Sequence, residues 1–112
     1  MPLINLRTSL NLDKKKEKLL KVLSAELSSL TGKPENYVMT SIDDGVQMTF
    51  AGSSEPCCYI EVKSIGALNP SKMSEAFCEI ISAHTGIKEN RIYIEFSDVP
   101  AKSWGWDGRT FG

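Results

Sequence analysis

The sequence has few of the residues that cross-link chains, bind metals or attract nucleic acid. It contains 3 cysteines and 1 histidine, with no Cys-x-x-Cys spacing. This excludes a disulfide scaffold and leaves too few ligands for a zinc site. The 13 basic and 14 acidic residues give a net charge of −1, so there is no basic field to bind nucleic acid or an anionic membrane. We therefore expect no metal, no cofactor, and no nucleic-acid or membrane partner.

Long apolar runs are also absent. The longest fall far short of a bilayer span. Asn5 and Arg7 interrupt the apolar beginning of the chain, so no signal peptide is expected and the predicted compartment is the cytosol. Cys57, Cys58 and Cys78 are expected to be reduced and buried. With 112 residues, of which 41% are hydrophobic, the chain fits one globular domain, residues 1–112.

A weak internal repeat organises this domain. An offset of 54 residues aligns the residues at the ends of the predicted elements in two halves, about residues 1–54 and 55–112. This alignment predicts a duplicated supersecondary unit. The aligned pairs are Pro2 with Pro56, Thr31-Gly32 with Thr85-Gly86, and Glu35-Asn36 with Glu89-Asn90.

Each half has the pattern of a strand, a helix and a second strand. Leucines at helical spacing mark the first helix, and Asn69-Pro70 is a capping signal for the second. Asp44-Gly45 is a hairpin signal that returns the chain through Val46, Met48 and Phe50. The predicted strands are Leu3 to Thr8, Tyr37 to Ile42, Cys57 to Ser64 and Arg91 to Phe96, and the predicted helices run from Asn11 or Asp13 to about Leu30 and from Asn69-Pro70 to Gly86. Right-handed crossovers then predict an α+β fold of duplicated β-α-β units, with a four-stranded mixed sheet and both helices on one face.

The last residues are rich in large apolar side chains. Val99, Trp104, Trp106 and Phe111 lie in a segment that contains glycine and proline, and a solvated tail does not normally carry two tryptophans. Either the tail folds back on its own core or it packs on a neighbour. Because a short sheet has open edges, we expect the neighbour and therefore an oligomer.

Several short segments together resemble the macrophage migration inhibitory factor and D-dopachrome tautomerase family. They occur from end to end in the family's order, and they are Met1-Pro2, Thr31-Gly32-Lys33-Pro34, Gly52-Ser53-Ser54-Glu55-Pro56-Cys57, Ser64-Ile65-Gly66, Arg91-Ile92-Tyr93-Ile94, Gly105-Trp106 and Thr110-Phe111. The resemblance implies a homotrimer that catalyses keto–enol tautomerisation of phenylpyruvate-like aryl α-keto acids or D-dopachrome analogues. It also implies that the site lies between adjacent subunits.

Three residues have polar roles by this resemblance. Taken without the resemblance, Pro2 is interpreted as a strand-edge proline. The resemblance implies that it is a catalytic base once Met1 is removed and its nitrogen is a secondary amine. Lys33 reads alone as a cation at a helix C-terminus, and the resemblance implies that it binds the substrate carboxylate. The main-chain N–H of Ile65 is the second implied donor to that carboxylate.

Without the resemblance, the remaining candidate site residues are interpreted as core or interface side chains. By resemblance, Tyr93 contacts the substrate, and an apolar pocket for its ring is lined by Leu3, Tyr37, Val99, Trp104, Trp106 and Phe111. Glu95 is an implied substrate contact that stands where better-known members carry an asparagine. Its carboxylate could accept a phenol proton, repel an anionic ligand, or be only an exposed strand side chain.

Two other function classes remain open. A cytokine-like binding or signalling protein could retain the pocket without using it, and the family includes a secreted cytokine that is exported without a signal peptide. A thiol oxidoreductase is disfavoured, because Ile60 stands where the second cysteine of the family's Cys-x-x-Cys would follow Cys57.

Overall fold

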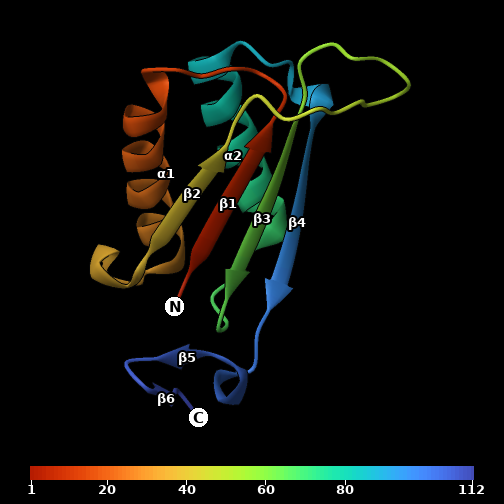
Figure 1. Cartoon of the computed structure of the whole chain (residues 1–112). Helices are drawn as coiled ribbons and strands as arrows, with labels where there is room; N and C mark the ends of the chain where they lie inside the picture. The colour runs from red at the N-terminus through yellow and green to blue at the C-terminus, as the bar shows by residue number, and fades with distance from the viewer.

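Four strands form one mixed sheet in the order β2-β1-β3-β4 in the computed structural model, which describes residues 1–112 (Figure 1). The central strand β1 pairs in parallel with β2 and antiparallel with β3, and β3 pairs in parallel with β4. The strands are β1 Leu3–Thr8, β2 Met39–Asp43, β3 Cys58–Ser64 and β4 Ile92–Asp98. The predicted four-stranded mixed sheet is confirmed, and β2 and β4 are its edges.

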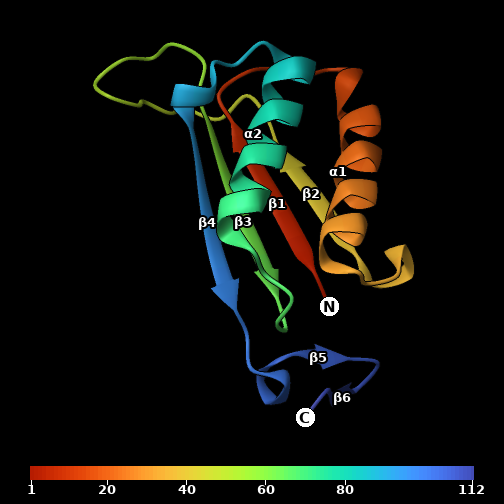
Figure 2. The ribbon, with the colours of Figure 1, turned by 180° about the vertical axis from the view of Figure 1, so that it is seen from behind.

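Two helices cover one face of this sheet, α1 Lys15–Thr31 and α2 Pro70–Thr85 (Figure 2). Their apolar faces and every second strand residue build the core, as the spacing predicted. The helical core residues are Leu19, Leu23 and Leu27 of α1 and Met73, Phe77 and Ile81 of α2. The α+β class is therefore confirmed, and neither helix has the length and apolarity that would let it cross a membrane.

The two helices end in the same way, 54 residues apart. Gly32 and Gly86 adopt left-handed φ angles of 71° and 77°, and each N–H donates to the carbonyl four residues earlier at 2.9 Å. Thr31 and Thr85 each donate their hydroxyl to the carbonyl of the preceding turn. A short 3₁₀ turn follows in both halves, η1 Glu35–Tyr37 and η2 Glu89–Arg91. The loops that carry Lys33 and Ile87 therefore leave their helices along equivalent paths.

The predicted start of α1 is wrong, because neither Asn11 nor Asp13 caps it. The helix begins at Lys15 without any side-chain cap. The hydrogen bond near the start of the helix comes from a residue distant in sequence, because the Asp44 carboxylate accepts the Leu12 N–H at 2.9 Å. For α2 the prediction is confirmed, since the Asn69 side chain accepts the N–H of Lys72 and Pro70 follows at the first helical position.

The hairpin predicted at Asp44-Gly45 is also wrong. Gly45 has a left-handed φ of 63°, but its N–H donates to the carbonyl of Leu10, and the N–H of Val46 donates to the carbonyl of Thr8. The chain is thereby tied to the end of β1, and it does not pair back on β2. The residues predicted to form the return strand, Val46, Met48 and Phe50, form none.

The C-terminal segment curls beneath the end of the sheet at which the chain begins (Figure 1). It comprises η3 Ala101–Ser103 and a two-stranded ribbon, β5 Gly105–Trp106 and β6 Arg109–Thr110. The N–H of Phe111 donates to the carbonyl of Trp104 at 3.2 Å, which closes the ribbon. This tail therefore brings its aromatic residues to the neighbourhood of Pro2.

Candidate active site

Two adjoining cavities lie at the end of the sheet where the chain begins. One, of about 230 Å³, is lined among others by Met1, Pro2, Leu3, Tyr37, Trp104 and Trp106. The other, of about 410 Å³, is lined by Met1, Lys33, Pro34, Tyr37, Ile65, Ala101 and Phe111. Met1 and Tyr37 line both. Most of the predicted site residues therefore surround one connected region.

Pro2 is buried directly ahead of β1. Its carbonyl oxygen accepts the N–H of Met39 at 3.1 Å, which fixes it against the start of β2. The free amine in this structure belongs to Met1, and its pKa lies below the usual value, first because of burial and second because of the positive charge of Lys33. Both causes disfavour an ammonium ion. An amine placed at this end of β1 is thus held in conditions that favour its neutral, basic form.

Lys33 is positioned by the turn that ends α1. The left-handed Gly32 redirects the chain, Thr31 Oγ1 accepts the N–H of Lys33 at 3.3 Å, and the Ser28 hydroxyl donates to the carbonyl of Lys33. The backbone of the lysine is therefore fixed at both of its polar groups, while its half-buried side chain lines the larger cavity.

Ile65 follows β3 directly and faces the same cavity. On one side of it, the Ser64 carbonyl accepts the N–H of Val99 at 2.9 Å, and on the other, the Gly66 N–H donates to the Asp98 carboxylate at 2.9 Å. The N–H of Ile65 itself takes part in no hydrogen bond within the chain. Lys33 and the residue with this free main-chain donor thus line one cavity, and an N–H donor together with an ammonium group suits a carboxylate.

The aromatic residues of the tail form a wall beside these polar groups. The Tyr37 and Trp106 rings meet edge to face with centroids 5.9 Å apart, and Trp106 stacks on Phe111 at 6.0 Å. Trp106 remains 51% exposed and Phe111 39% exposed. The tail therefore contacts Tyr37 of its own chain and leaves aromatic surface uncovered, and its predicted packing on a neighbour stays a prediction.

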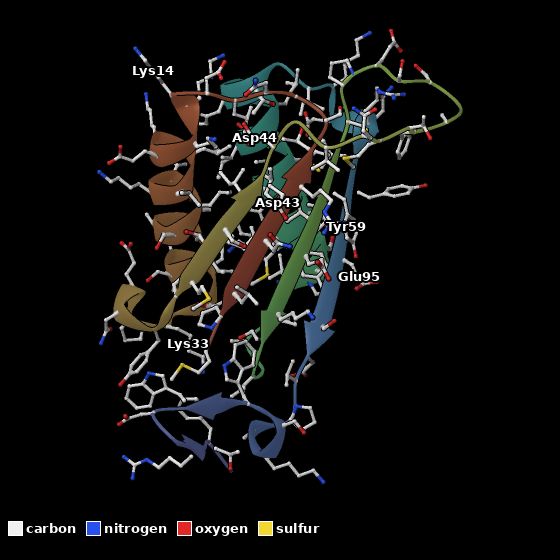
Figure 3. All side chains as sticks on the ribbon, viewed as in Figure 1. Lys14, Lys33, Asp43, Asp44, Tyr59 and Glu95 are labelled. Atoms are coloured by element: carbon white, nitrogen blue, oxygen red, sulfur yellow. The ribbon has the colours of Figure 1, made fainter.

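Tyr93 and Glu95 do not join this group. Tyr93 pairs with Tyr59, and Tyr59 pairs with Arg7 at the far end of β1, so Tyr93 lies about 13 Å along the strands and about 10 Å across them from Leu3. Figure 3 shows that Glu95, on β4, is likewise separated from Lys33, which lies at the end of the sheet where the chain begins. Val99 lines neither cavity and contributes its backbone bond to Ser64. A single chain therefore assembles only part of the predicted set.

Glu95 faces a second carboxylate on the open face of the sheet. Its register partner is Glu61, which accepts a hydrogen bond from Asn5 at 3.4 Å. The Tyr59 side chain lies near Glu95 (Figure 3), and desolvation, followed by the charges of Glu95 and Glu61, raises the pKa of Tyr59 above its usual value. The surroundings of Glu95 are thus polar and acidic, unlike the apolar wall near Pro2.

Sequence reasoning missed some of the cavity-lining residues. Pro34 follows Lys33 in a segment that the resemblance had already marked, so its place could have been anticipated. Met39 and Ala101 had no such signal. Met39 lines the site because β2 pairs with the start of β1, and Ala101 because the tail folds beneath the sheet.

A smaller cavity, of about 100 Å³, occupies the equivalent place in the second half. It is lined by Glu55, Pro56, Gly86, Ile87, Lys88 and Arg91. Here Arg91 stands 54 residues after Tyr37, and its Nε donates to the carbonyl of Pro56 at 3.0 Å. In the second unit the Arg91 guanidinium therefore fills space that corresponds to the larger cavities beside Tyr37 in the first unit.

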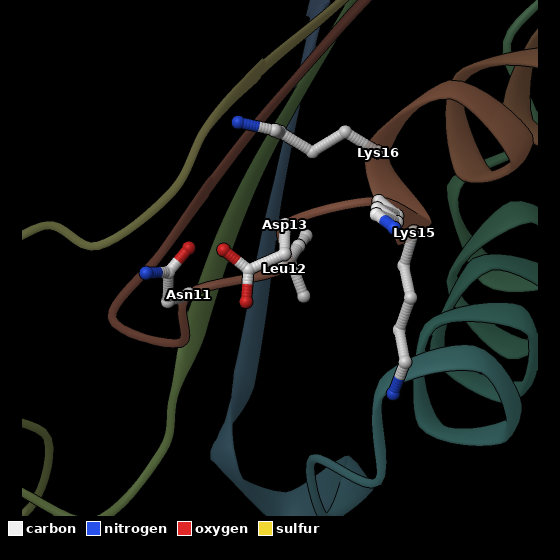
Figure 4. A pocket seen from close by; sticks show the side chains of 6 residues that line it. Asn11, Leu12, Asp13, Lys15 and Lys16 are labelled. Carbon is white, nitrogen blue, oxygen red and sulfur yellow. The ribbon is translucent and has the colours of Figure 1, made fainter.

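A wide hollow at the opposite end of the sheet is lined by residues 11–16 (Figure 4). The side chains of Lys15 and Lys16 point in different directions there, and Lys16 is bound to Asp44 at 3.4 Å. No set of donors converges on this hollow.

The three cysteines are free thiols. Cys57 and Cys58 are buried and Cys78 is half-buried. Burial, followed by the neighbouring Cys57 and Cys78, raises the pKa of Cys58 to about 12, and burial also raises the pKa of Cys78. A thiolate is the reactive form of cysteine, so these two groups are held in their unreactive form.

Comparison with known proteins gives one consistent result over the whole chain. The family "Macrophage migration inhibitory factor (MIF)" matches residues 1–112. A macrophage migration inhibitory factor homolog of Brugia malayi is 34% identical, with 100% of both chains covered. The crystal structure of a homologue from Prochlorococcus marinus has a TM-score of 0.94 at 53% identity, covering 98% of this chain and 99% of that one. The factor from Trichinella spiralis has a TM-score of 0.92 at 29% identity, with 97% and 99% covered.

Proposed function

The chain belongs to the macrophage migration inhibitory factor family, and we propose that it is a keto–enol tautomerase of phenylpyruvate-like aryl α-keto acids with Pro2 as its general base. The observation that carries the proposal is the setting of the N-terminal amine. The Met1 amine is desolvated and is close enough to Lys33 for that charge to lower its pKa, and Pro2, buried one residue further along, lines the adjoining cavity. No cofactor is needed for a proton transfer of this kind.

In the proposed reaction, Met1 is first removed, so that the Pro2 nitrogen becomes a secondary amine. The neutral amine takes a proton from the carbon next to the substrate's carbonyl group, and it returns the proton to the other end of the enol system. A base that titrates near the working pH is suited to both steps, and such catalysis contributes about 10²–10⁴ in rate.

Lys33 and the N–H of Ile65 are proposed to hold the substrate carboxylate. They line the same cavity, one supplies a positive charge, and the other is a donor without a partner in the chain. The same charge stabilises the negative charge that develops on the enolate. The aryl ring is proposed to lie against Tyr37, Trp106 and Phe111, whose exposed ring surface would lose water on binding.

We further propose that the active unit is a homotrimer, with Tyr93 and Glu95 supplied to each site by a neighbouring subunit. Three features support this. Both residues lie too far from Pro2 to act within one chain, and β4, which carries them, is a sheet edge. The Tyr93 side chain is 65% exposed in the isolated chain, as expected of a residue that another copy covers.

The test combines an assembly measurement with an assay. Sedimentation equilibrium should give three times the chain mass, and processed protein should ketonise phenylpyruvate. Pro2→Gly should lose nearly all of that activity while remaining trimeric. Equal activity of the two proteins would refute Pro2 as the base. A processed trimer with no turnover of phenylpyruvate or hydroxyphenylpyruvate would refute the enzyme and favour the binding-protein alternative.

A further inference from the structure

The loop between β2 and β3 projects from the sheet (Figure 1) and is held by one side chain. Arg91 donates from Nε to the Pro56 carbonyl at 3.0 Å and from Nη1 to the Phe50 carbonyl at 3.1 Å. Its Nη2 donates to the carbonyls of Ser53 and Glu55 at 3.2 and 3.0 Å. Four main-chain acceptors of one loop therefore converge on a single guanidinium.

The loop is shaped to present these acceptors. Phe50 and Ser53 exchange two main-chain hydrogen bonds, at 2.9 and 3.0 Å, across a turn with left-handed Ala51 and Gly52. This turn brings the Phe50 and Ser53 carbonyls within reach of the same side chain. No carboxylate forms an ion pair with Arg91, so the planar fork of the guanidinium is satisfied by carbonyl oxygens.

The same guanidinium also holds an aromatic ring. Its carbon lies 5.2 Å from the centroid of the Phe50 ring, within the range of a cation–π contact. Phe50 in turn meets Tyr93 edge to face, with ring centroids 4.7 Å apart and planes at 69°. Tyr93 is otherwise largely exposed, so Phe50 is the aromatic contact that orients it.

We propose that Arg91 is a positioning residue: it holds Phe50 against Tyr93 and thereby presets the Tyr93 ring for substrate. The inference rests on the proposed function for the identity of the substrate and for the role of Tyr93. Its structural part, the orientation of Tyr93 by Arg91 through Phe50, stands on the contacts within one chain. A ring that is already oriented costs less conformational entropy when the substrate binds.

The proposal predicts that loss of the Arg91 contacts raises KM and leaves kcat nearly unchanged. Arg91→Lys keeps the positive charge, but a lysine cannot reach four carbonyls with a planar fork. We expect KM for phenylpyruvate to rise about three- to tenfold, the range for the loss of an aromatic pair. The value of kcat should stay within about twofold, because Pro2 and Lys33 are untouched. Lys88→Gln is the matched control, since Lys88 lines the same small cavity and should leave both constants unchanged.

A double-mutant cycle distinguishes positioning from general stability. In a Tyr93→Ala background, Arg91→Lys should have no further effect on KM, because the residue through which it acts is gone. Independent, multiplying effects on KM would overturn the proposal. Phe50→Leu keeps the carbonyls that bind Arg91 and removes only the ring, so it should reproduce the rise in KM even if Arg91→Lys folds poorly. An unchanged KM in Phe50→Leu would overturn the proposal as well.

A readout that does not use activity keeps the two hypotheses apart. In Arg91→Lys, amide hydrogen exchange over residues 44–57 should accelerate, and the NMR signals of the Tyr93 ring should shift towards those of an unrestrained tyrosine. If wild-type protein fails to turn over phenylpyruvate, the proposed function fails, and the Tyr93 signals still decide whether Arg91 positions this ring. Unchanged Tyr93 signals would refute the positioning role whatever the activity.

Discussion

The carbonyl oxygens of Pro2 and Pro56, 54 residues apart, accept hydrogen bonds from different kinds of donor. Pro2 is bound by the main-chain N–H of Met39 at 3.1 Å, and Pro56 by the Nε of Arg91 at 3.0 Å. In the second unit a side chain therefore fills the space, whereas in the first the corresponding Tyr37 lines two larger cavities. The Pro56 nitrogen is also always an amide. Pro56 thus serves as an internal control for the claim that Pro2 acts through a free amine.

Removal of the Lys33 charge should weaken substrate binding. We expect Lys33→Ala to raise KM for phenylpyruvate about 10- to 100-fold, because a hydrogen bond to a charged group contributes about 1.5–3 kcal/mol. Lys88→Ala, at an exposed lysine beside the equivalent helix end, is the control and should leave KM unchanged. Steady-state kinetics of the two variants checks this, and equal values of KM would show that Lys33 does not bind the carboxylate.

The pH dependence of the reaction should reveal the amine. Burial and Lys33 lower the pKa of the Met1 amine, and we expect the same two causes to act on the Pro2 amine that takes its place once Met1 is removed. The value of kcat/KM should then fall only as the pH drops below the usual range of an α-amino group. Lys33→Gln removes a cation and so makes protonation of the amine easier, which should shift the fall in kcat/KM to higher pH. A fall at the same pH as in wild type, or at a lower pH, would contradict the electrostatic account.

The thiols should be poor nucleophiles in the folded protein. Since the pKa of Cys58 is raised to about 12 and the pKa of Cys78 is also raised, few thiolates exist at neutral pH. We expect alkylation by iodoacetamide to be slow in native protein and to reach all three cysteines only after unfolding, as counted by mass spectrometry. Rapid labelling of native protein, with catalysis of insulin reduction, would support the thiol oxidoreductase alternative.

Asp44 should contribute to stability through the start of α1. Its carboxylate accepts the Leu12 N–H and contacts Lys16, and these contacts, the first above all, lower its pKa. A carboxyl with a lowered folded-state pKa stabilises the fold above its unfolded pKa, and this stabilisation is lost as the pH falls through the folded value. Asp44→Asn should therefore reduce Tm at pH 7, and the difference from wild type should shrink below about pH 3.9. Asp43→Asn, on the neighbouring exposed residue, is the control.

The elements that the sequence predicted correctly are those that depend on local pattern. Leu19, Leu23 and Leu27 repeat at helical spacing and are buried, and Gly32 ends the helix as its left-handed φ requires. Lys33 and Ile65 were found through motif resemblance, and the fold brings them to one cavity. In each case the signal lies within a few residues of the feature that it specifies.

The features that the sequence did not predict depend on contacts between distant residues. The carboxylate that serves the start of α1 comes from Asp44, 32 residues after the Leu12 N–H that it binds. The Asp44-Gly45 pair is a local hairpin signal, but the N–H groups of Gly45 and Val46 bind carbonyls near the end of β1. Tyr93 could be marked as a site residue, yet its distance from Pro2 appears only in the register of three strands.

The central claim is that a free amine at Pro2 performs the chemistry. It is tested most directly by preparing the protein with and without Met1, verifying each form by intact mass, and measuring phenylpyruvate ketonisation by both at equal protein concentration. The account predicts activity in the form that begins at Pro2 and a loss of about 10²–10⁴ in kcat/KM in the form that retains Met1, where the Pro2 nitrogen is an amide. Equal activity of the two forms would contradict it.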